Sequence, residues 1–302
     1  MYIELTETMM QDWDIQAEFN PPEVLRQIEN YSPEDFTPQN WNKIMYFKGK
    51  AIFTMHGREE AREIALDCIR NAIVEDDFYT LVKCHVLQAV SYYRTDNEDR
   101  IRPLLELAVD YAIDSGDYEL MIHARCAYLF YLMRQSQFEQ AQNQEIRVVD
   151  LIKRVPPSYI TASALSTIAG LYIDMAKWNT AIKFYKQALE QAEALSLKIS
   201  QLNLLNNLGS AICRVNNLPQ AEKILQQGLA LAQQMGHKQQ EFLFTSNLGN
   251  LKIQEGQHQE AILYYDRCMK ILENVPQKPP MLLIDMYNNY SLCYWKLKLA
   301  DE

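Results

Sequence analysis

The sequence NNLGSAICRVNNLPQAEKIL, residues 206–225, is followed 40 residues later by SNLGNLKIQEGQHQEAILYY, residues 246–265. Both stretches contain a Leu-Gly pair, then a polar break, and then an alanine that opens a new apolar stripe. A pattern that returns at a fixed interval of this size predicts a solenoid, in which each copy forms one unit and stacks on its neighbours.

The same register extends along most of the chain. Steps of 40 residues from one alanine reach Ala61, Ile101, Ala141, Ala181, Ala221 and Ala261. A second position, twelve residues earlier in each unit, holds Gly49, Ala89, Leu129, Ala169, Gly209 and Gly249. Both positions are mostly small, so we expect them where two antiparallel helices touch closely.

Each unit should contain two helices, which we name A and B. Apolar residues recur at three- and four-residue spacing on both sides of the polar break, as in amphipathic helices. Pro219 should lie just inside the start of a helix B, where a missing N–H costs nothing. Gly116 and Gly236 should lie where helices B end, because glycine readily adopts the left-handed conformation of a helix C-terminus.

Composition narrows the class of protein. The chain has 302 residues, of which 48% are hydrophobic, enough for a sizeable core. No apolar run approaches the length of a membrane span, and the first ten residues do not resemble a signal peptide. We therefore expect a soluble, cytoplasmic, all-α protein. The formal charge of −10 argues against nucleic-acid binding.

The sequence contains no pattern that indicates catalysis or a cofactor. The six cysteines and five histidines are scattered without a C-x-x-C pair, which argues against disulfides and a zinc site. A glycine-rich phosphate loop, H-E-x-x-H and G-x-S-x-G are all missing from the sequence. We predict a protein without enzymatic activity, metal or cofactor.

The acidity is concentrated in residues 1–40, which we interpret as an N-terminal leader. This segment has nine Asp and Glu residues against Arg26, a sum of −8, so the rest of the chain sums to −2. One hypothesis is that the leader caps the exposed apolar end of the first repeat. The other is that it folds back and occupies a basic groove, imitating a partner.

The repeats resemble the tetratricopeptide repeat. In residues 204–228 the matching small and apolar positions are Leu205, Leu208, Gly209, Ile212, Ala221, Leu225 and Gly228. In residues 165–189 they are Leu165, Ile168, Ala169, Tyr172, Ala181, Tyr185 and Ala188. The period of 40 exceeds the usual 34 or so, and is similar to the long-helix repeats of kinesin light chains and bacterial Rap and PlcR-type peptide-sensing regulators.

The resemblance implies a right-handed superhelix of six helix-turn-helix pairs and a final single helix. The expected repeats are residues 41–80, 81–120, 121–160, 161–200, 201–240 and 241–280, with a partial one at 281–302. The last segment, MYNNYSLCYWKLKLADE, reads as a seventh helix A displaced by two residues, after a longer VPQKPP loop. It is either a terminal cap or the start of a repeat in a longer protein.

Helices A are expected to line a concave groove, and their inward residues are candidates for partner binding. The N-terminal candidates combine cations with aromatic rings: Lys43, Tyr46, Lys50, Lys83, Tyr93, Arg94, Phe130 and Arg134. Such a mixture suits a partner with carboxylates and an apolar anchor. Any one of these cations could instead be part of a solvated helix face.

The C-terminal candidates are mostly asparagines: Asn206, Asn207, Asn247, Asn250 and Asn288, together with Arg214. An asparagine amide can pair with both the N–H and the C=O of an extended peptide, and the resembling families use inner-wall asparagines in this way. The alternative is that Asn207, Asn247 and Asn289 satisfy backbone groups between neighbouring repeats.

We predict a protein- or peptide-binding module that holds a partner segment, possibly an acidic one, in this groove. The alternative is the sensory input domain of a larger bacterial signalling protein, with a DNA-binding or diguanylate cyclase output domain after residue 302. A structural scaffold that self-associates through its helices B is a third possibility, and a homo-oligomer is compatible with the sequence.

Overall fold

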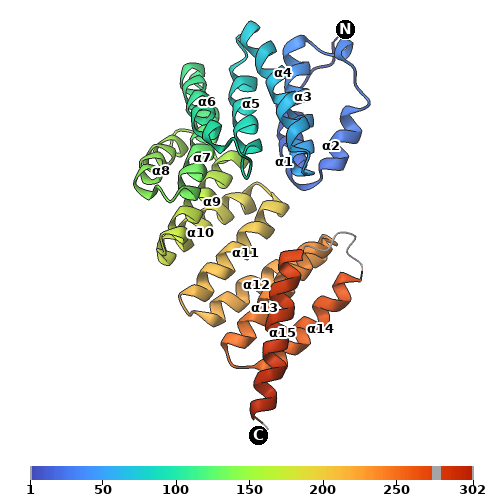
Figure 1. Ribbon diagram of the computed structural model, residues 1–302, viewed down its shortest axis with the longest axis vertical. Helices are drawn as coiled ribbons and strands as arrows, with labels where there is room; N and C mark the ends of the chain where they lie inside the picture. Colours follow the sequence, from blue (N-terminus) through green and yellow to red (C-terminus); the bar gives the residue numbers. More distant parts are fainter. Residues whose placement is uncertain (1, 274–279, 301–302) are drawn as a thin grey trace. The chain divides into compact units, whose positions relative to one another are not determined.

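The computed structural model describes residues 2–273 and 280–300, and every regular element within these ranges is a helix (Figure 1). The expected all-α class is therefore confirmed. The chain divides into two compact units, residues 1–156 and residues 157–302. None of the helices in the described ranges has the length and apolarity needed to cross a bilayer.

Unit 1 begins with the leader and continues with three helix pairs. The leader forms α1 (Glu7–Phe19), α2 (Pro21–Ile28) and the short 3-10 helix η1 (Pro33–Asp35). The pairs are α3 (Pro38–Thr54) with α4 (Arg58–Val74), α5 (Phe78–Ser91) with α6 (Ile101–Ser115), and α7 (Tyr118–Arg134) with α8 (Phe138–Ile152). A second short helix, η2 (Glu98–Arg100), leads into α6.

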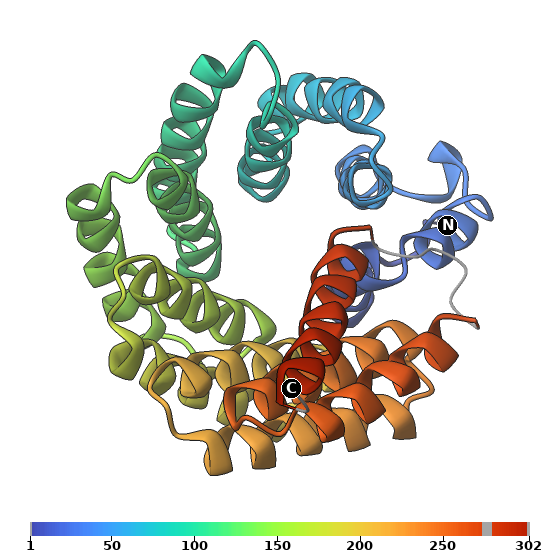
Figure 2. The ribbon, with the colours of Figure 1, turned by 60° about the horizontal axis from the view of Figure 1, so that its bottom comes forward.

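Unit 2 contains three further pairs and the final helix, and each helix packs on the next one in sequence (Figure 2). The pairs are α9 (Tyr159–Asp174) with α10 (Trp178–Ala194), α11 (Lys198–Arg214) with α12 (Leu218–Gln234), and α13 (Lys238–Gln254) with α14 (His258–Leu272). The final helix is α15 (Pro280–Ala300). The predicted six pairs and one single helix are confirmed.

The helices follow the predicted register closely. The six paired helices A begin at residues 38, 78, 118, 159, 198 and 238. One more step of 40 would reach residue 278, but α15 begins at residue 280, which confirms the displacement by two. Most of the preceding VPQKPP segment lies outside the described residues.

The turns repeat as regularly as the helices. Left-handed backbone conformations recur on a 20-residue register from which residues 96 and 156 are missing: His56, Asp76, Gly116, Ser136, Ala176, Ser196, Asn216, Gly236 and Gly256. Arg94 is also left-handed but lies off this register. A left-handed residue after a helix lets the following N–H groups bond to the last free carbonyls. The predicted ends at Gly116 and Gly236 are confirmed, and Pro219 lies in the first turn of α12.

Small residues allow helices A and B of each pair to approach closely. The five alanines of the register are fully buried. A Cβ atom added to Gly209 would lie 2.7 Å from Leu225 Cδ2, and one added to Gly249 would lie 2.9 Å from Tyr265 Cε1. Side chains at these glycines would push the paired helices apart, which confirms the expected role of the small positions.

The leader packs on the first helix pair. Trp13 of α1 is buried, and its ring lies 5.9 Å from that of Phe47 on α3. Val24 and Ile28 of α2 are buried in the same cluster. The apolar side of the leader thus shares one core with α3, and this packing fixes the position of α1.

We predict that Gly228→Ala destabilises the protein by about 1–3 kcal/mol, because the added methyl group would overlap the buried Phe244 ring of the next repeat. Urea unfolding followed by circular dichroism measures the change. Gln227→Ala, at the exposed neighbouring position, is the control. Equal stability of the two variants would contradict the packing described here.

Candidate functional site

The N-terminal candidates of α3 and α5 surround a carboxylate of the leader. Lys50 Nζ lies 2.7 Å from Asp14 Oδ1, and Lys83 Nζ lies 3.0 Å from Asp14 Oδ2. The Tyr46 hydroxyl donates a hydrogen bond of 3.3 Å to Asp14 Oδ1. We call Asp14, Tyr46, Lys50, Lys83 and the nearby His123 the Asp14 cluster.

Charge compensation makes this cluster stable despite its burial. Burial alone would raise the pKa of Asp14, but the ammonium groups of Lys50 and Lys83 outweigh it and hold that pKa well below its usual range. Burial and the charge of Lys83 lower the pKa of His123, whose buried Nε2 atom has no hydrogen-bond partner among the described residues. His123 is therefore a neutral member of the cluster.

The Asp14 cluster leaves little of the N-terminal inner face open. Tyr46 is 3% exposed and Lys83 is 2% exposed. Helix α1 thus occupies the position that we expected a partner's carboxylate to take. Lys43 lies outside the cluster, with Nζ 5.5 Å from the centre of the Tyr79 ring.

A second group in unit 1 joins Tyr93, Phe130 and Arg134. The Arg134 guanidinium lies 5.3 Å from the centre of the Tyr93 ring and 6.0 Å from that of Phe130. Phe130 and Arg134 are exposed, whereas the Tyr93 hydroxyl is buried and has no hydrogen-bond partner in the described part of the chain. Burial raises the pKa of Tyr93. The structure brings these three predicted residues together.

Tyr93 and Arg94 were both expected on the inward face of a helix A, and this placement is wrong. Helix α5 ends at Ser91, and Arg94 lies in the following turn with a φ of 61°. The hydroxyl of Thr95 donates a 2.7 Å hydrogen bond to the carbonyl of Tyr92. This bond satisfies a terminal carbonyl and closes the helix three residues before Arg94.

In unit 2, asparagines link neighbouring helices A. Asn247 Nδ2 donates a 2.6 Å bond to Asn206 Oδ1, joining α13 to α11. Asn289 Nδ2 donates a 2.8 Å bond to Asn250 Oδ1, joining α15 to α13. The asparagine row, as we call it, consists of Asn206, Asn207, Asn247, Asn250, Asn288 and Asn289.

The alternative interpretation expected the row to satisfy backbone groups, but among the described residues its side chains bond to other side chains and not to the backbone. Its bonds run between side chains, and Asn250 Oδ1 also accepts a 2.7 Å bond from the Tyr265 hydroxyl. Within the described part of the chain, the Nδ2 groups of Asn207 and Asn250 and the Oδ1 atom of Asn247 have no bonding partner. Both donors and acceptors of the row therefore remain for a ligand.

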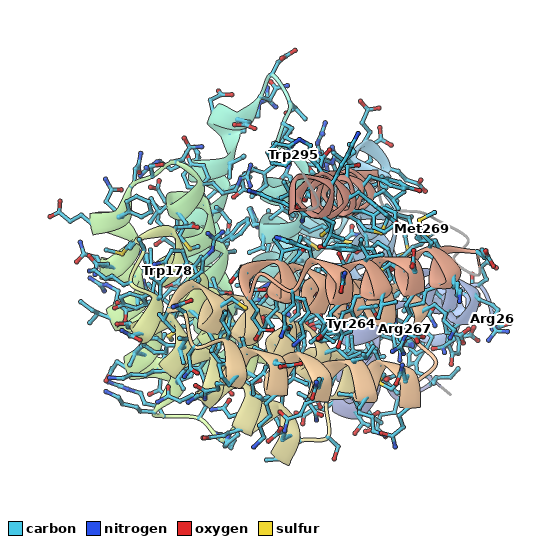
Figure 3. All side chains as sticks on the ribbon, turned by 90° about the horizontal axis from the view of Figure 1, so that it is seen from below. Arg26, Trp178, Tyr264, Arg267, Met269 and Trp295 are labelled. Atoms are coloured by element: carbon cyan, nitrogen blue, oxygen red, sulfur yellow. The ribbon has the colours of Figure 1, made fainter. Side chains whose placement is uncertain are left out.

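Arg214, at the end of α11, borders a small cavity of about 220 Å³. Its walls include Trp178, Asn207 and Ser210. The guanidinium carbon lies 5.7 Å from the centre of the Trp178 ring, and Figure 3 labels Trp178 on α10. We call this site the Arg214 pocket.

The sequence analysis missed Trp178. The feature that could have pointed to Trp178 is its place directly after the polar break MAK, as the first residue of a helix B. A large aromatic residue at this point can reach the end of the next helix A. The periodicity assigns no special role to the first residue of helix B, so the contact with Arg214 was not foreseen.

A larger cavity of about 720 Å³ lies between α2 and α3. Leu25, Trp41 and Met45 line it, and Lys48 and Glu60 also border it. The residues described by the structure contain no group of three or more His, Cys, Asp or Glu that could hold a metal ion. All six cysteines are free thiols.

The repeats of unit 2 match a known family. Residues 160–234 and 200–274 each match the family described as tetratricopeptide repeat. The two overlapping matches together span residues 160–274. No curated protein is significantly similar in sequence to the chain.

Solved structures share the fold over most of the chain. A Rap protein complexed with competence and sporulation factor is 13% identical, with a TM-score of 0.62 over 98% of this chain and 87% of Rap. NprR in complex with its cognate peptide NprX is 12% identical, with a TM-score of 0.55 over 98% of this chain and 86% of NprR. BtubC (BKLC) from P. vanneervenii is 15% identical, with a TM-score of 0.55 over 76% of this chain and 92% of BtubC.

These similarities confirm the resemblance to Rap, PlcR-type and kinesin light chain-like repeat proteins at the level of the fold. At such low identity they assign no ligand and no residue role to this chain. The comparisons thus support the fold, whereas the asparagine row and the Arg214 pocket are described from the structure of this chain alone.

We predict that Asp14→Asn destabilises unit 1 by about 3–5 kcal/mol, because it leaves the buried ammonium group of Lys83 without a carboxylate. Urea unfolding at pH 7 measures the loss. Asp12→Asn removes the same charge from an exposed position of α1 and is the control. A loss no larger than that of the control would contradict the importance of the ion pairs.

The same cluster predicts a pH dependence of stability. The pKa of Asp14 is lower in the folded protein than in the unfolded chain. The contribution of Asp14 to the free energy of unfolding is therefore complete above the unfolded pKa of about 3.9. This contribution is lost as the pH falls below about 4. Urea unfolding between pH 6 and pH 3 should show a steeper loss for the wild type than for Asp14→Asn; parallel curves would contradict it.

Proposed function

We propose that this protein binds an extended peptide or protein segment along helices α11, α13 and α15, and that it acts by binding rather than by catalysis. The observation that carries the proposal is the asparagine row, which presents unpaired amide groups along three neighbouring helices A. The row forms the proposed binding surface together with Arg214.

The chemistry of the row suits a peptide backbone. An extended peptide exposes N–H donors and C=O acceptors in alternation, and an asparagine amide complements either group. Hydrogen bonds to the peptide backbone do not depend on the ligand's side chains, so the row by itself would bind peptides of different sequences.

The bonds within the row prepare it for binding. The bonds from Asn247 to Asn206 and from Asn289 to Asn250 restrict the rotation of these side chains before a ligand arrives. Less side-chain entropy is then lost on binding, which improves affinity without any added contact. A row of unbonded asparagines would lack this advantage.

The comparisons support a peptide as the ligand class. Rap and NprR, whose folds resemble this one, are described in complex with competence and sporulation factor and with the peptide NprX. The state of unit 1 favours unit 2 as the primary site, because Asp14 already pairs with Lys50 and Lys83. Lys43, Tyr93, Phe130 and Arg134 would form a secondary surface for an acidic partner.

A displayed library of random peptides tests the proposal. We expect the wild type to enrich a set of related peptides, and Asn207→Ala combined with Asn250→Ala to weaken one such peptide about tenfold or more, since each lost hydrogen bond contributes about 0.5–1.5 kcal/mol. Fluorescence anisotropy of the labelled peptide measures the affinity. Asn179→Ala, at an exposed position of α10, is the control.

Two results would overturn the proposal. One is that the wild type enriches no peptide above background. The other is that the double variant, with helical content and urea midpoint equal to those of the control, binds the selected peptide as tightly as the wild type.

A further inference from the structure

Arg125, near the middle of α7, departs from the repeat pattern. The equivalent positions of the other five paired helices A, at steps of 40 residues, hold Met45, His85, Leu165, Leu205 and Thr245. Burial lowers the pKa of His85, so that ring is neutral at pH 7. Arg125 is thus the one cation of this series, and it is only 8% exposed. A residue that breaks a local rule of its fold in this way is typical of a functional site.

The charge of Arg125 is not compensated within the protein. Its Nη1 atom donates a 2.9 Å hydrogen bond to Gln144 Oε1 on α8, and no Asp or Glu in the described ranges lies within ion-pair distance of it. Burial and the nearby charge of Arg147 lower the pKa of Arg125, and they outweigh Asp110 of α6, which would raise it. A buried guanidinium without a carboxylate is costly, and a like charge beside it adds to that cost.

The pair α13–α14 shows how the repeat can compensate such a charge. Arg267 is the counterpart of Arg147, three steps of 40 residues later, and its Nη2 atom lies 3.5 Å from Glu241 Oε1 on α13. The counterpart of Glu241 in α7 is Met121. The pair α7–α8 therefore has the arginine of helix B without the carboxylate of helix A.

Arg125 and Arg147 border one cavity of about 550 Å³, together with Asn143, Gln144 and Ile146. The Nε and Nη2 groups of Arg125 have no acceptor among the described residues, yet they are not sealed from solvent. The bond from Arg125 also orients the Gln144 amide, because it holds the Oε1 atom and leaves the Nε2 donor free. The cavity thus combines two guanidinium groups with amide donors.

These donors suit a phosphoryl group. Guanidinium groups bind two phosphoryl oxygens at once, and a phosphoryl group on a side chain carries about −1.5 to −2 charges at pH 7, enough for two arginines. A water molecule occupies about 30 Å³ in the liquid, so the cavity also has room for the group that carries the phosphoryl. Ile146, which is 64% exposed, offers that group an apolar contact.

We propose that Arg125 and Arg147 bind a phosphoryl group, carried either by a phosphorylated side chain of a partner protein or by a small phosphate ester. The site lies on the pair α7–α8 of unit 1 and includes no residue of the asparagine row or the Arg214 pocket. It would let the protein distinguish a phosphorylated ligand from the unphosphorylated form. The inference does not depend on the proposed function.

Arg125→Met, which introduces the residue found at position 45, tests whether the arginine serves the fold or a ligand. We expect it to retain or raise the urea midpoint of the wild type in the absence of phosphate, because an apolar side chain replaces a buried charge that has no counter-ion. Inorganic phosphate, compared with sodium chloride at equal ionic strength, should raise the midpoint of the wild type more than that of Arg125→Met. A large loss of stability in the variant, or an equal effect of phosphate on both proteins, would overturn the proposal.

Binding is tested on the full chain with Arg147→Gln, which changes an exposed residue, and with the control Lys186→Gln, which removes an exposed cation from α10. The probes are phenyl phosphate and peptides selected from a library with a fixed phosphoserine, phosphothreonine or phosphotyrosine. Each selected peptide is also made without its phosphate. Isothermal titration calorimetry measures the affinity of every probe.

We expect Arg147→Gln to bind the phosphorylated probes about tenfold or more weaker than the wild type and Lys186→Gln do, because hydrogen bonds between two charged groups are the stronger ones. Tighter binding of a phosphopeptide than of phenyl phosphate identifies a phosphorylated side chain as the source, and equal affinity identifies a small ester. The proposal is wrong if no phosphorylated probe binds the wild type, if removal of the phosphate leaves the affinity unchanged, or if Arg147→Gln binds as tightly as the control.

Discussion

The close approach of helix A to helix B is the contact on which the rest of the structure depends. Neither helix can bury its apolar stripe alone, so each pair must pack tightly and then stack on the next. Buried small residues make this possible, as at Gly209 against Leu225 and at Ala221. Because the contact recurs every 40 residues, equivalent positions of successive helices A come to lie beside one another.

This alignment has a direct consequence for recognition. Asn206 and Asn247 lie 41 positions apart in sequence and Asn250 and Asn289 lie 39 apart, yet both pairs are hydrogen-bonded. A solenoid thus turns a period in sequence into a row of equal groups in space. A row of amides suits a ligand that is itself periodic, and an extended peptide backbone is such a ligand.

The two units use their inner polar groups differently. In unit 1 the cations of α3 and α5 are paired with Asp14, which comes from the leader rather than from a repeat. In unit 2 the amides of the row are only partly bonded, and Arg214 has an aromatic partner but no carboxylate among the described residues. The first arrangement stabilises the fold, since a buried charge without its partner is costly. The second leaves bonding capacity for recognition.

In unit 2 the asparagine row would contribute affinity more than specificity. Amide groups that bind the backbone contribute affinity with little regard to ligand sequence.

The sequence by itself determined the repeat, the six helix pairs, the displaced final helix and the turns at Gly116 and Gly236. These features depend on local periodicity and backbone preference, which short stretches of sequence encode directly. The sequence also predicted the asparagines and Arg214 as inward residues, since their spacing along helix A is regular. Only the tertiary structure placed Asp14 between Lys50 and Lys83, moved Arg94 out of its helix and brought Trp178 to Arg214. Those contacts join residues outside the repeat pattern, and packing across many positions decides them.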